Sequence, residues 1–200
     1  WKVKDRHYMT LWDARDLPKV EKLQEKIRAT HDENLTRDFF TLLNKKWDDH
    51  RNLEIEPLTE AVKDDVLTYK GIAKMMKLVT MQDNTTFTTV ATGVGAPADA
   101  QPLPFEENLS SETHHVDFVR NGFFDAAGAS LRYSGTFGAT IATEHYNESL
   151  VRNVADAGDT GKVVLCIAKF DDDDINHESG DTGFTCAGSI EFTIIADSDL

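Results

Sequence analysis

The sequence has few cysteines, whose disulfides stabilise many small secreted proteins, and no long apolar run. Its 200 residues include only two cysteines and five prolines, which matches neither a disulfide scaffold nor a zinc-binding pattern. We expect Cys166 and Cys186 to pack as small apolar side chains. No stretch approaches the roughly 18 apolar residues of a spanning helix, and no secretory leader opens the sequence, so we expect no membrane association. The first residue is Trp1 rather than Met, as in a fragment or a processed product.

Positive charge is scarce in the second part of the chain. Residues 1–81 carry 16 Lys and Arg against 15 Asp and Glu, whereas residues 82–200 carry 5 against 20. The net charge is −14, and a surface this acidic repels phosphate backbones, so we expect no direct binding of nucleic acid. Composition and charge together divide the chain into two regions, which we place at residues 1–65 and 66–200.

The first region shows the apolar spacing of amphipathic helices. Apolar residues recur every three or four positions after Pro18, and Asp16 is placed to cap the helix that this spacing predicts. The same spacing returns after a polar break at residues 31–34 and predicts a second helix. Each helix has one apolar stripe that needs a partner. A helical hairpin within the chain would supply one, but we favour a helical assembly segment that contacts another subunit or the second region. The predicted interface residues are Val20, Leu23, Ile27, Leu35, Phe39 and Leu42.

Two further helices are predicted at residues 58–66 and 68–81. In the second of these, the spacing predicts one buried apolar side and one solvated lysine side. The buried side would consist of Ile72, Met75, Met76 and Val79, and the solvated side of Lys70, Lys74 and Lys77.

From Thr85 onward the composition changes to Thr, Val, Phe and Gly, with turn residues every ten or so positions, which is typical of an all-β module. The predicted strands cover residues 87–92, 113–121, 130–137, 148–154, 163–170 and 189–195. The fifth of them is apolar on both faces and should be central. The predicted fold class is therefore α+β, with an N-terminal helical segment followed by an antiparallel β-sandwich or jelly-roll-like domain.

The order of segments in the second region resembles a module of tailed-virus structural proteins, which occur in bacteriophages and in tailed viruses of archaea. The family's "LGTG" turn is matched by residues 91–95, its "E.GL" segment by 148–150, its "ARxxF" strand end by 168–170 and its closing strand by 189–195. The resemblance spans residues 66–195. It implies a non-enzymatic virion protein of the tail, baseplate, collar or capsid exterior, without catalytic residues, whose partners are its own copies and other virion proteins.

The most acidic segment begins with four aspartates at residues 171–174. Asp172, Asp174 and Asn176 have the first spacings of an EF-hand calcium loop, but His177 stands where that loop needs glycine, which excludes an EF-hand. Two interpretations remain, a looser calcium or magnesium site on these three residues and a solvated hairpin tip.

Two other functions compete with the virion hypothesis. A carbohydrate- or receptor-binding module for host attachment would use exposed aromatic side chains, and Tyr133 and Tyr146 are the candidates. A metal-dependent hydrolase would be built around His115 and Asp117. Adjacent histidines on a strand face opposite sides, so only one of His114 and His115 can share a face with Asp117. No phosphate-binding loop, nucleophile elbow or zinc-protease motif accompanies them.

Overall fold

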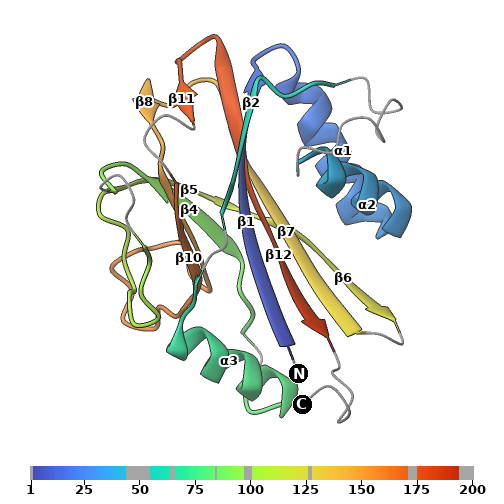
Figure 1. The fold of residues 1–200 in the computed structure, drawn as a ribbon, viewed down its shortest axis with the longest axis vertical. Helices are drawn as coiled ribbons and strands as arrows, with labels where there is room; N and C mark the ends of the chain where they lie inside the picture. The colour runs from blue at the N-terminus through green and yellow to red at the C-terminus, as the bar shows by residue number, and fades with distance from the viewer. Residues whose placement is uncertain are drawn as a thin grey trace.

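The part of the chain that the structure describes contains three helices and twelve strands, an α+β fold (Figure 1). The computed structural model describes residues 2–43, 55–63, 66–83, 85–96, 101–125, 128–170 and 175–193. The helices are α1 (Leu17–Thr30), α2 (Glu33–Leu42) and α3 (Tyr69–Val79). The strands are β1 (Lys2–Asp13), β2 (Thr59–Lys63), β3 (Val66–Leu67), β4 (Thr89–Gly93), β5 (Glu112–Asp117), β6 (Val119–Asp125), β7 (Gly128–Phe137), β8 (Glu144–His145), β9 (Glu148–Arg152), β10 (Val164–Lys169), β11 (Asn176–His177) and β12 (Thr182–Thr193).

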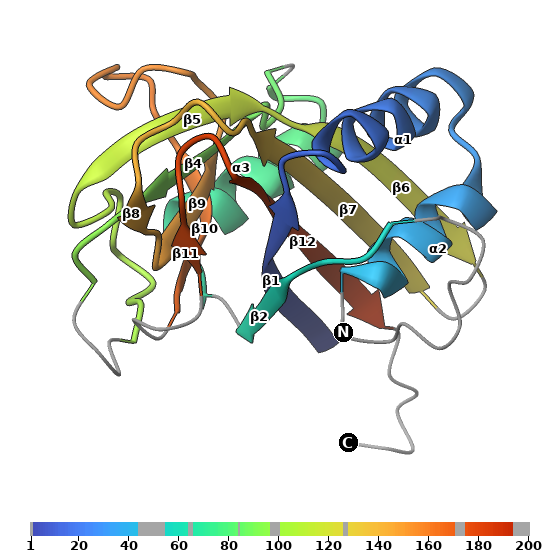
Figure 2. The same cartoon turned by 90° about the horizontal axis from the view of Figure 1, so that it is seen from above.

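Most strands belong to two antiparallel sheets. Sheet A has the order β2-β1-β12-β7-β6 and sheet B the order β3-β10-β9-β4-β5, while β8 and β11 form a separate pair. Figure 2 shows sheet A between the α1–α2 pair on one side and sheet B on the other. The described residues therefore confirm the predicted α+β class with antiparallel strands, arranged as open sheets and not as a closed barrel.

Strand β1 was not expected in a helical N-terminal region. It pairs with β12 along its whole length and with β2 on its other side. Both of its faces are buried: Tyr8 and Trp12 belong to the cluster under the helices, whereas Met9 and Leu11 belong to the cluster between the sheets. A strand buried on both faces loses the alternation of apolar and polar residues that would have predicted it.

The helix predicted at residues 58–66 is also wrong. Residues 59–63 form β2, which pairs with β1, and residues 66–67 form β3, which pairs with β10. The segment is short, and its neighbours in the sheets decide its conformation over its own spacing. The helical part of residues 1–65 that the structure describes is therefore confined to α1 and α2.

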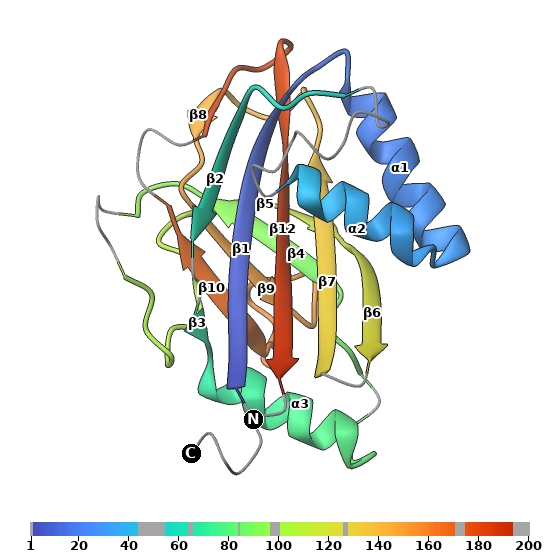
Figure 3. The same cartoon turned by 45° about the vertical axis from the view of Figure 1, so that its right-hand side comes forward.

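Helices α1 and α2 cover the outer face of sheet A, as Figure 3 shows from the side. Their apolar side chains form one cluster with Tyr8, Trp12 and Ala187 of the sheet. The apolar stripes were expected to contact another subunit or the second region, and they pack on sheet A, whose strands β7, β12 and β6 belong to the second region. The six residues named for that interface all pack in this cluster: Val20, Leu23, Ile27, Leu35, Phe39 and Leu42.

The two N-terminal helices begin in different ways. Pro18 lies in the first turn of α1, as expected, but the carboxylate of Asp16 binds Nζ of Lys19 at 2.8 Å and makes no capping hydrogen bond. Asp32 is the side chain that caps, since its Oδ1 accepts a hydrogen bond from the N–H of Leu35 at 3.0 Å at the start of α2. The polar residues 31–34 therefore separate the two helices, and Asp32 among them caps the start of α2.

The main core lies between the two sheets. Met9 and Phe184 of sheet A and Val151 and Leu165 of sheet B belong to one apolar cluster. Gly188 is required in this layer, because a Cβ at that position would lie 2.2 Å from the hydroxyl oxygen of Tyr133.

Five of the six predicted strands correspond to β4, β7, β9, β10 and β12, with different ends. Strand β10 lies between β3 and β9 and is buried along nearly its whole length, as predicted for a central strand. The strand predicted at residues 113–121 is instead two strands, β5 in sheet B and β6 in sheet A. The chain changes sheet at Phe118, whose N–H donates to the carbonyl of Thr88 at 2.9 Å.

Candidate functional site

The acidic segment is described only in part. Asp172 and Asp174 lie outside the described residues, and Asn176 is an exposed residue of β11 that pairs with His145. Among the residues that the structure does describe, no group of three or more His, Cys, Asp and Glu side chains is placed to hold a metal ion. The calcium or magnesium site therefore stays a prediction.

Strand β5 alternates between an exposed and a half-buried face. His115 and Asp117 lie on the exposed face, as predicted, and His114 lies on the other, with its ring centroid 6.2 Å from that of Tyr146. Nδ1 of His115 lies 3.7 Å from Oε1 of Glu112, whose carboxylate is held by the fully buried guanidinium of Arg152. The carboxylate nearest to His115 thus has a structural role.

The two tyrosines named as sugar-binding residues are both fully buried, so that prediction is wrong. The hydroxyl of Tyr133 lies 3.3 Å from Nδ1 of His7 and 3.2 Å from Sγ of Cys166, between the sheets. The hydroxyl of Tyr146 donates to the carbonyl of Ala142 at 3.0 Å. Tyr133 turns inward because it occupies the inner-facing register of β7, as Phe137 does four residues later.

Burial favours the neutral forms of two titratable groups in the core, His7 and Cys186. Burial lowers the pKa of His7 to about 4, against a smaller upward effect of Asp5. Burial also raises the pKa of the Cys186 thiol to about 12. Cys166 and Cys186 are both buried free thiols, which confirms that they pack inside the protein. These groups are suited to stabilising the core and are closed to solvent.

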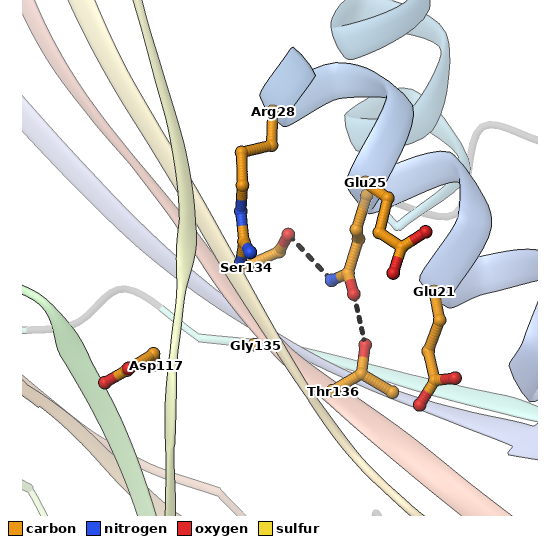
Figure 4. Close-up of a pocket in the computed structure, with 8 residues that line it drawn as sticks. Glu21, Glu25, Arg28, Asp117, Ser134, Gly135 and Thr136 are labelled. Atoms are coloured by element: carbon orange, nitrogen blue, oxygen red, sulfur yellow. Dashed lines mark hydrogen bonds between the residues drawn. The ribbon is translucent and has the colours of Figure 1, made fainter.

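A polar groove lies between α1 and β7 (Figure 4). Its volume is about 340 Å³. Gln24 connects the helix to the strand in it: Nε2 donates to Oγ of Ser134 at 2.9 Å, and Oε1 accepts from Oγ1 of Thr136 at 2.8 Å. Because its amide is satisfied on both sides and buried, Gln24 fixes α1 on sheet A and leaves binding to the residues at the rim.

The rim of the groove is charged and continues toward aromatic residues. Glu21, Glu25 and Arg28 come from α1, and Asp117 comes from β5 across the groove (Figure 4). A neighbouring hollow of about 320 Å³ shares Arg28 and Asp117. The groove therefore has a carboxylate-rich end and an end with aromatic rings, the latter lined by Phe87, Thr88 and Phe118.

Helix α3 is held on sheet B through its backbone. Oγ1 of Thr68 accepts from the N–H of Gly71 at 2.9 Å and donates to the carbonyl of Val164, so it caps the helix and ties it to β10. Gly71 faces the same strand, and a Cβ at that position would lie 2.6 Å from the carbonyl oxygen of Leu165. This close approach fixes which side of α3 faces sheet B.

The buried and exposed sides of α3 differ from the prediction. Lys74, expected in solvent, is only 5 % exposed, and its Nζ lies 2.7 Å from Oδ2 of Asp83. Of the expected buried side, Met75 packs against the core, but Ile72 is 41 % and Met76 60 % exposed. Compared with the prediction, the helix is rotated about its own axis. This orientation is possible because Gly71 can contact a strand backbone and Asp83 neutralises the buried Lys74. A glycine inside a predicted helix was the sequence signal for this contact.

A loop extends the apolar side of α3. The N–H of Tyr69 donates to the carbonyl of Pro104 at 2.9 Å, and Nζ of Lys70 lies 2.5 Å from Oε1 of Glu107, so residues 104–107 lie beside the first turn of the helix. Large apolar side chains are exposed on both elements. We call them the α3 surface, which consists of Tyr69, Ile72, Met76, Leu103 and Phe105.

No family model, curated protein or solved structure matches this chain. Within the described residues, no helix is long and apolar enough to cross a membrane.

Proposed function

We propose that this protein is a non-enzymatic structural protein of a tailed virus, an oligomeric building block of the tail, baseplate, collar or capsid exterior. Its partners are its own copies and other virion proteins. The resemblance over residues 66–195 supports the proposal, and so do two antiparallel sheets, which we propose to be a β-sandwich or jelly-roll-like arrangement. Such a module is rigid enough to be repeated in a ring or shell.

The α3 surface is the observation that carries the proposal. Its side chains are exposed together on a helix and loop that hydrogen bonds and an ion pair hold in place. Exposed apolar side chains that gather on ordered elements mark surfaces for association, because contact with a partner removes them from water. Helices α1 and α2 do not supply such a surface, since sheet A covers their apolar stripes.

Light scattering combined with size-exclusion chromatography tests this proposal. We expect the wild-type chain to form an oligomer that Met76→Glu dissociates toward the monomer, because a carboxylate would be buried in the contact. Lys26→Glu, at an exposed position of α1, is the matched control and should leave the oligomer intact. A wild-type chain that stays monomeric at high concentration, or an oligomer indifferent to Met76→Glu, would contradict the proposal.

Carbohydrate binding for host attachment is the second candidate, and the groove beside α1 favours it. Carboxylates and the guanidinium of Arg28 can exchange hydrogen bonds with sugar hydroxyls, and the half-buried ring of Phe118 can pack on the apolar face of a sugar. A glycan array should then detect binding that Asp117→Asn weakens and Glu33→Gln, an exposed residue outside the groove, does not. Absence of binding to every glycan, or an equal effect of both variants, would remove this candidate.

A further inference from the structure

We infer that the α3 surface is covered by the same surface of a second copy, with the two α3 helices antiparallel across a twofold axis near Ala73. The inference rests on the proposed function, since it names the partner that covers the surface and the geometry of the contact. Ala73 is exposed and lies between Tyr69 and Met76 on the outward side of the helix. A small residue at this place lets two helices approach to about 8 Å.

Charge favours contact between copies through this region. The net charge is −14, so two copies repel each other over most of their surfaces. Residues 66–81, by contrast, contain three lysines and no acidic residue. Lys74 is neutralised by Asp83, and Lys70 by Glu107, which leaves Lys77 exposed at the far end of the helix. Two copies therefore meet with the least repulsion where α3 faces α3.

The two ends of the α3 surface complement each other. The loop that carries Phe105 and Glu107 lies beside the N-terminal end of α3, whereas Lys77 lies near its C-terminal end and Met81, 93 % exposed, just beyond it. Antiparallel pairing about Ala73 brings each N-terminal end to the partner's C-terminal end. Each Lys77 then lies beside the partner's Lys70–Glu107 ion pair and away from the partner's own Lys77.

Parallel pairing lacks this complementarity. It would place like ends side by side, so that the two lysines at position 77, whose charges no carboxylate among the described residues of this region neutralises, meet each other. Antiparallel pairing also aligns the helix dipoles favourably, because the positive end of each helix lies beside the negative end of the other. Among arrangements with twofold symmetry, the antiparallel one is thus the arrangement that the described residues favour.

Disulfide trapping in the full chain tests the geometry. Ala73→Cys would place two thiols across the axis, whereas Thr80→Cys, also exposed, would hold them about 20 Å apart in an antiparallel pair and close together in a parallel pair. The native cysteines are both buried and do not compete. Under mild oxidation we expect Ala73→Cys to form covalent dimers at least about a hundredfold faster than Thr80→Cys, because pairing raises the effective thiol concentration toward millimolar.

The outcomes separate this inference from the proposed function. Rapid linkage of Ala73→Cys with slow linkage of Thr80→Cys supports antiparallel pairing. Equal or faster linkage of Thr80→Cys overturns it. Slow linkage of both variants, in a chain whose oligomer still depends on Met76, overturns the twofold pairing and leaves the proposed function standing. A monomeric wild-type chain removes both. Thermal unfolding of each variant, compared with wild type, establishes that the substitutions at these exposed positions leave the fold intact.

Discussion

Helices α1 and α2 bury their apolar stripes against the outer face of sheet A, whereas α3 packs Gly71, Lys74 and only part of its apolar side inward and leaves Tyr69, Ile72 and Met76 exposed. The sequence predicts a buried apolar side for α3, and it leaves open whether the stripes of α1 and α2 contact each other, another subunit or the second region. Its spacing is amphipathic in all three helices. The difference arises because amphipathic spacing shows that a stripe exists and does not show which surface covers it.

The surface that covers each helix is set by a neighbouring strand. The outer side chains of β1, Tyr8 and Trp12, provide an apolar face for α1 and α2. Beneath α3, the backbone of β10 comes so close that only Gly71 fits. Met75 and Leu78 of α3 still pack on the core, whereas Tyr69, Ile72 and Met76 lie away from this close contact and stay exposed.

The largest expected effect comes from comparing a buried apolar residue of α2 with an exposed apolar residue of α3. Phe39→Ala should lower the free energy of unfolding by about 3–5 kcal/mol, because Phe39 is fully buried under the N-terminal helices and leaves a cavity. Met76→Ala should change it by less than about 0.5 kcal/mol in the monomer, because its side chain is mostly exposed. Urea unfolding at low protein concentration measures both. Similar losses of unfolding free energy for the two variants would contradict the conclusion that the stripe of α2 is buried and Met76 of α3 is exposed.

Acid should weaken the core between the two sheets through His7. Its pKa is about 4 in the folded protein and 6.5 in the unfolded chain, so the unfolded chain binds the proton first. The contribution is complete above pH 6.5 and is lost as the pH falls toward 4, and it amounts to about 3 kcal/mol. Unfolding free energies measured across this range should fall more steeply for wild type than for His7→Gln. Parallel curves would show that His7 titrates normally and is not enclosed between the sheets.

A smaller effect is expected where α3 contacts sheet B. Gly71→Ala should lower the free energy of unfolding by about 1–3 kcal/mol, because the new methyl group meets strand backbone that cannot rotate away. Gly138→Ala is the matched control, since no atom lies within 4 Å of a Cβ there. Should Gly71→Ala instead stabilise the protein, as alanine does in an unobstructed helix, the close approach of α3 to β10 would be refuted.

Patterns that depend on neighbours along the chain were predicted well from the sequence. The apolar spacing placed α3 at nearly its observed bounds, and the doubly apolar run of β10 predicted a central strand. Strand β1 escaped prediction, because its buried polar residues Asp5 and His7 and its two buried faces mask the alternation. The aromatic candidates failed for a related reason. The sequence did not reveal which face of β7 is turned inward, and Tyr133 lies on that face.

The candidate surfaces depended on contacts between distant segments. The groove brings α1 together with β5 and β7, and the α3 surface brings a helix together with a loop about thirty residues away. Local spacing fixed the fold class and the position of most elements, since helical and strand periods are properties of consecutive residues. Which stripes are buried and which remain exposed was fixed by the packing of β1 and β10, because burial is decided by the surface that comes to lie against a side chain.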